Sequence, residues 1–165
     1  MKPAADTWTF SSAILAIAGL IIAGIGLYFM VLRPSLLPED VRYMGLSAAE
    51  LEAVGPRLGS WLTHVFRVLG GYAFATGVLL IALAATAFRA RHPVAVAGAL
   101  VGGASSIGLM SIVNFMIDSD FKWALFASAL VWAGSLMVFW FESDRLNGPQ
   151  QEVSPSSHQW KEPNA

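Results

Sequence analysis

The side chains of this sequence that could do chemistry form two pairs, each set within an apolar stretch. His64 and Arg67 are three positions apart and Asn114 and Asp118 are four apart, so each pair shares one face of a helix. Arg67 is always charged, and an unpaired guanidinium in hydrocarbon costs several kcal/mol. We therefore expect Arg67 to form a charge-assisted pair with Asp118.

The positions of the two pairs along the chain place them at the same depth. Arg67 lies about 24 residues before the middle of the basic turn 89–93, Asp118 lies about 27 residues after it, and a helix rises about 1.5 Å per residue. In an antiparallel hairpin through this turn, the two side chains should meet within one helical turn.

Two interpretations of this polar cluster stay open. In the first, Arg67, Asn114 and Asp118 form a satisfied clamp that fixes the register of two helices, which is the simpler interpretation. In the second, the clamp lines an outward-facing cavity, where an anionic or polar head group displaces Asp118 from Arg67. The candidate ligand-binding residues of that cavity are His64, Arg67, Tyr72, Ser111, Asn114 and Asp118.

Other chemistries find little support. Cysteine is absent, which removes disulfides, thiolate metal sites and cysteine nucleophiles. The three histidines, at positions 64, 92 and 158, are too far apart for a metal or haem site, and the serines of the third apolar stretch have no base beside them. A net charge of −1 without a run of basic residues gives no reason to expect nucleic acid. We predict no cofactor, no metal and no catalytic site.

The composition indicates what must position these residues. An apolar content of 56% with 13% charged residues predicts a membrane-embedded chain. The apolar runs predict four spans, at about 10–32, 61–88, 94–117 and 121–141. Short connections make neighbouring spans antiparallel, so we predict an all-α, up-down four-helix bundle over 10–145, preceded by a short segment 1–9 and followed by a disordered polar tail 146–165. The first run is too long and unbroken for a signal peptide, the competing interpretation.

Small residues predict close helix contacts. In the first span they share one face: Ser12, Ala16, Gly19, Ala23 and Gly26. In the third span Gly98 and Gly102, and Ala99 and Gly103, have the spacing at which membrane helices approach each other.

The loop between the first two spans is predicted to be partly helical. Ser47 and Glu50 have the form of a capping box, and Gly55 followed by Pro56 would end the helix. This helix either lies at the membrane interface over the bundle or forms a lid over a cavity.

The order of several motifs resembles a family of small uncharacterised bacterial four-span membrane proteins, and is more distantly similar to the DoxX-like group. The matching motifs are Gly24 to Tyr28, Arg33-Pro34, the segment FRVLGGYA at 66–73 with Gly77, and Asn114 near Asp118. The resemblance covers about 14–140. It implies four spans in a bacterial inner membrane and brings no catalytic residues.

Arg89 and Arg91 lie in the shortest loop, which favours cytoplasmic termini for this multi-pass chain. Given the slim Gly/Ala faces and the lack of a catalytic constellation, we expect a structural or accessory protein. Its partners would be membrane lipid, a second copy or another membrane protein. The alternative is a binder or transporter of a small polar or lipid-like ligand in the cavity at Arg67 and Asp118.

Overall fold

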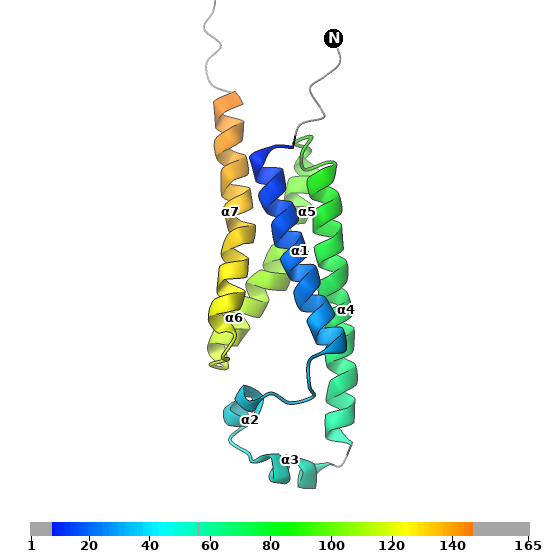
Figure 1. Cartoon of the computed structure of the whole chain (residues 1–165). Helices are drawn as coiled ribbons and strands as arrows, with labels where there is room; N and C mark the ends of the chain where they lie inside the picture. Colours follow the sequence, from blue (N-terminus) through cyan, green and yellow to red (C-terminus); the bar gives the residue numbers. More distant parts are fainter. Residues whose placement is uncertain (1–7, 56, 147–165) are drawn as a thin grey trace, which may run out of the picture.

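The computed structural model describes residues 8–55 and 57–146, and these form an all-α fold with four long helices that run alternately up and down (Figure 1). The long helices are α1 (Phe10–Val31), α4 (Leu58–Ala85), the continuous run of α5 (Pro93–Gly103), η1 (Ala104–Gly108) and α6 (Leu109–Met116), and α7 (Lys122–Leu146). The predicted four-helix fold is confirmed. The helix ends differ from the predicted ones: α4 begins at Leu58 rather than Trp61, and α7 continues to Leu146 rather than ending at Phe141. The predicted tail from residue 147 onward and residues 1–7 lie outside the described residues.

The first loop carries two short helices, α2 (Pro38–Met44) and α3 (Ala48–Val54). The capping box that begins α3 is confirmed, because the Ser47 backbone N–H donates to Glu50 at 2.7 Å and the Glu50 N–H donates to the Ser47 hydroxyl at 3.2 Å. Hydrogen bonds from the side chain and backbone of Ser47 lower the pKa of the Glu50 carboxyl. The long first loop is therefore partly helical, as predicted.

All four long helices have the length and apolar composition needed to cross a membrane, and the chain is a multi-pass membrane protein. Large apolar side chains cover the outside of these helices, where lipid replaces water as the neighbour. Exposed tryptophans lie near both ends of the helices, at the level where indole rings prefer the interface: Trp8, Trp61, Trp123 and Trp140.

The most extensive contact between helices in the described residues joins α1 to α4, which lie side by side and antiparallel (Figure 1). Two glycines of α1 meet two of α4. A Cβ added to Gly19 would lie 2.8 Å from the carbonyl oxygen of Gly77, and one added to Gly26 would lie 2.7 Å from that of Gly70. A side chain at these positions would collide with backbone, so the helices can approach this closely only with glycine there. The predicted close-packing face of the first span is confirmed at Gly19 and Gly26.

The two patterns predicted for the third span differ in outcome. A Cβ added to Gly102 meets nothing within 4 Å, so the expected close contact is wrong at Gly102, whereas one added to Gly98 would lie 3.7 Å from the Leu83 side chain of α4, an ordinary contact. At Gly103, in contrast, a Cβ would overlap the Trp132 ring of α7, and the Trp132 indole N–H donates to the carbonyl oxygen of Ala99 at 3.0 Å. Close packing at Ala99 and Gly103 is confirmed, although the partner is an indole ring and not a helix backbone.

A second polar clamp, different from the one predicted at Arg67, closes the bundle at the end where α1 begins and α7 ends. The Ser11 hydroxyl donates to Glu142 at 2.6 Å, and Arg91 donates to the same carboxylate oxygen at 3.0 Å. Arg91 also donates to the Ser143 hydroxyl, and its guanidinium lies over the Phe139 ring. The clamp therefore joins α1, the turn between α4 and α5, and α7.

The glycine contact predicts opposite effects for two neighbouring substitutions in α4. Gly70→Ala places a methyl group 2.7 Å from the Gly26 carbonyl and should lower the free energy of unfolding by about 1–3 kcal/mol. Gly71→Ala meets open space and should leave stability unchanged or raise it by up to about 1 kcal/mol, because alanine favours helix. Unfolding by SDS titration in mixed micelles measures both variants, and equal midpoints would contradict the contact.

The clamp predicts that Glu142→Gln lowers the free energy of unfolding by about 1–3 kcal/mol, since Ser11 and Arg91 lose a charged acceptor. Asp144→Asn removes an exposed charge two residues further along α7 and serves as the control. The same SDS titration applies, and a loss shared by both variants would point to net charge instead of the clamp.

Candidate functional site

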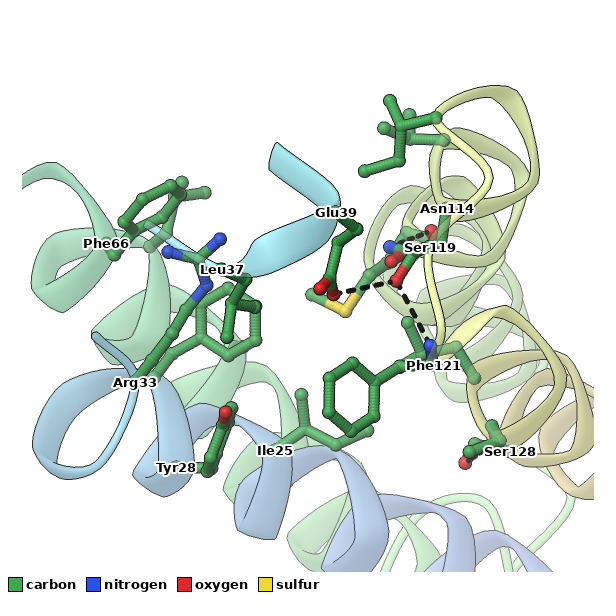
Figure 2. A pocket seen from close by; sticks show the side chains of 18 of the residues that line it. Ile25, Tyr28, Arg33, Leu37, Glu39, Phe66, Asn114, Ser119, Phe121 and Ser128 are labelled. Carbon is green, nitrogen blue, oxygen red and sulfur yellow. Dashed lines mark hydrogen bonds between the residues drawn. The ribbon is translucent and has the colours of Figure 1, made fainter. Parts of the chain in front are cut away.

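A cavity of about 590 Å³ lies between the long helices at the end covered by α2 (Figure 2). Side chains from α1, α4, α6 and α7 form its walls, and most of them are apolar. Polar side chains gather at the α2 end of the cavity: Arg33, Glu39, Asp40, Asn114 and Ser119. A volume of this size with few polar groups is typical of a small-molecule site.

Arg33, directly after α1, is the cation of the cavity. Its side chain is 5% exposed, and it donates to Asp40 at 2.9 Å. The guanidinium carbon lies 3.4 Å from the centre of the Phe66 ring and 5.3 Å from that of Phe29, so two aromatic faces add to the ion pair. Its buried Nε–H has no acceptor among the described residues. The charge of Arg33 is thus neutralised, while one donor is left unpaired.

The sequence of α2 explains why a helix begins at the mouth of the cavity. Pro38 occupies the first turn, where its missing N–H costs nothing, and Glu39 and Asp40 place negative charge at the helix N-terminus. The Asp40 carboxylate also accepts the Leu37 N–H at 2.9 Å. Gly45 ends the helix with a φ of 67°, in the left-handed region that favours glycine.

Glu39 is the second carboxylate of the cavity and is only 2% exposed. The Ser119 hydroxyl donates to it at 3.3 Å, and Ser119 in turn accepts the Phe121 N–H at 3.1 Å (Figure 2). Asp40 ties α2 to the end of α1, and Glu39 ties it to the connection between α6 and α7. The helix α2 therefore bridges two walls of the cavity.

Of the six predicted site residues, the structure places Asn114 in the cavity wall. Its side-chain amide donates to the Met110 carbonyl at 2.8 Å, within its own helix. Ser111 is 4% exposed and is not among the residues that line the cavity. The sequence thus identified one member of the cavity wall.

His64, Arg67 and Tyr72 are exposed and lie outside the cavity lining. Residues 68–85 of α4 carry no charge and span roughly 27 Å as helix, close to the thickness of the hydrocarbon layer. Arg67 therefore lies at one boundary of this layer, where a long side chain can extend its guanidinium to the head groups and water. It needs no protein partner there.

The predicted ion pair between Arg67 and Asp118 is wrong. Asp118 pairs with Lys122 one turn further on, and its backbone carbonyl accepts from Arg42 at 2.9 Å. The bond and charge of Lys122 lower the pKa of the exposed Asp118 carboxyl. None of the ion pairs within residues 8–55 and 57–146 includes Arg67.

The course of the third membrane crossing explains this error. In Figure 1, α5 lies beside α4 near their connecting turn, whereas α6 lies beside α7 at the other end. The crossing thus slants away from α4, so its far end is separated sideways from α4 although the depth agrees. The space left between α4 and α6 is part of the cavity, whose walls include Phe66 and Leu69 on one side and Met110 and Val113 on the other.

Sequence reasoning missed α2, Arg33 and Glu39. A signal was present, because Pro38 followed by Glu39 and Asp40, with Gly45 beyond, has the form of a short capped helix. The helix that was predicted, α3, contributes no residue to the cavity lining, so it is not the lid of this cavity. The burial of Arg33 against Phe66 joins two distant segments, and the sequence carried no sign of it.

Comparison with known proteins adds no assignment: no family model, no curated protein and no solved structure matches this chain.

Proposed function

We propose that the protein binds a lipid-like amphiphile in the cavity beneath α2. The observation that carries this proposal is the division of the cavity into apolar walls contributed by four membrane-spanning elements and a polar end at α2. An amphiphile has the same division, so its chain would lie along the walls and its head group would face Arg33 and Glu39.

The side of the cavity between α4 and α6 supports the proposal that the ligand enters from the membrane. Leu69 of α4 is 48% exposed and Val113 of α6 is 41% exposed, and both line the cavity. These two helices diverge, so the space between them opens toward lipid. A hydrophobic chain could enter there without crossing water.

We further propose a bacterial plasma membrane with both termini in the cytoplasm. Arg89 and Arg91 in the short turn support this orientation by the positive-inside rule. The α2 end of the cavity would then lie on the outer side.

The structural or accessory role, with a second copy, another membrane protein or lipid as partner, is the alternative proposal. The glycine face of α1 is covered by α4, so a protein partner would need another face. Gly71 and Gly102 offer such places, since an added Cβ meets nothing there. A chain that binds no amphiphile in the cavity but co-purifies with one defined membrane protein would favour this role.

Filling the cavity tests the proposal. Gly24 lines the cavity and an added Cβ meets nothing within 4 Å, so the side chain of Gly24→Leu would begin in the open space of the cavity. We expect labelling by a diazirine-bearing dodecanol in lipid nanodiscs, mapped by mass spectrometry, to fall about tenfold at the cavity residues, which corresponds to about 1.4 kcal/mol.

Gly71→Leu is the matched control, because it adds the same side chain to a membrane helix outside the cavity lining. Its labelling should equal that of the unmodified chain. Labelling spread evenly over lipid-facing residues, and unchanged by Gly24→Leu, would exclude the cavity as a binding site.

A further inference from the structure

Glu39 is the one charge at the cavity that no opposite charge neutralises in the part of the chain that the structure describes. It is 2% exposed, and its bonded partner is the neutral hydroxyl of Ser119. None of the ion pairs between described residues includes it. A buried carboxylate is costly unless it is paired, so this position lacks a cation.

The neighbouring cations are already engaged. Arg33 is neutralised by Asp40 at 2.9 Å and covered by the Phe66 ring. At the rim, Arg42 pairs with Asp120, and Lys122 pairs with Asp118. Arg33 and Asp40 neutralise each other, so Glu39 is the carboxyl group at the polar end of the cavity that has no cation beside it among the described residues.

We propose that the head group bound here is a cationic ammonium group that pairs with Glu39. This inference rests on the proposed binding of an amphiphile in the cavity. An ammonium group supplies the missing charge and donates to the carboxylate, and the Phe121 ring on the apolar side of Glu39 in Figure 2 offers a face that attracts cations.

An anionic head group fits the same place poorly. It would lie beside the Glu39 carboxylate, and the cation within reach, Arg33, is already neutralised by Asp40, so a second anion would add uncompensated negative charge. The unpaired Nε–H of Arg33 needs only an uncharged acceptor, such as a hydroxyl or ester oxygen. Charge complementarity at the cavity thus selects the cation.

The test is a competition against the diazirine-bearing dodecanol in nanodiscs of phosphatidylglycerol, with dodecylamine, dodecanol and dodecanoate as competitors. On the unmodified chain, dodecylamine should compete about tenfold better than the other two. Each competitor is also measured on Gly24→Leu, which separates binding in the cavity from partitioning into the disc. This ranking needs no variant of Glu39 and holds even where such a variant fails to fold.

Glu39→Gln keeps an acceptor for the Ser119 hydroxyl and removes the charge, so it should abolish the preference for dodecylamine while dodecanol competes as before. Asp120→Asn removes an exposed carboxylate at the same end of the molecule and should leave the preference intact.

Equal competition by all three compounds would overturn the ammonium inference and leave amphiphile binding standing. A preference for dodecanoate that Arg33→Gln abolishes would overturn it in favour of an anionic head group. Absence of cavity labelling by the probe would overturn the proposed function itself.

The ammonium group could belong to a membrane lipid or to a free amine. Replacing phosphatidylglycerol in the disc by phosphatidylethanolamine separates these sources. If the lipid is the source, dodecylamine should compete less well in the second disc. If a free amine is the source, its competition should be equal in both.

Discussion

The glycine contact between α1 and α4 decides how the other elements are arranged. Because Gly26 and Gly70 bring two backbones together, these helices form a thin and rigid pair. Neither helix can accept another partner on that face, so the third crossing packs elsewhere. It begins near α4 and ends beside α7, and the contact of Gly103 with Trp132 joins it to α7 on the way. The cavity is the space that this divergence leaves.

The two ends of the bundle use charge in different ways. At the end formed by the turn between α4 and α5, Glu142 accepts from both Arg91 and Ser11, so each charge has its partner. Such a set holds three elements together and leaves nothing for a ligand to satisfy. At the other end, α2 also bridges distant elements, yet among the described residues the buried Glu39 carboxyl bonds only the Ser119 hydroxyl. The two ends therefore differ in whether each buried charge has a partner of opposite charge, and not in how many polar groups they contain.

Much of the fold was readable from the sequence because it depends on local patterns. Apolar runs gave the four crossings, the spacing of Gly19 and Gly26 gave a close-packing face, and the capping box at Ser47 gave α3. The ion pair between Arg67 and Asp118 failed for a geometric reason. Counting residues from a turn sets the depth of a side chain, but it says nothing of the angle at which two helices separate. That angle depends on contacts with α7, and the spacing of Ala99 and Gly103 indicated a close contact without indicating that Trp132 of α7 would fill it.

Arg33 and Arg67 show why the site itself was harder to predict than the fold. Both cations lie at the same end of the membrane-spanning region, near α2, and both follow or interrupt an apolar run. Arg67 is exposed and forms no ion pair with any residue that the structure describes. Arg33 is covered by Phe66 and Asp40, because α2 folds back over the end of α1. The charge of Arg33 is buried because the loop that carries α2 returns onto the bundle. A residue's type and depth therefore indicate that a cation must be compensated, and the path of the loop decides whether protein or solvent does so.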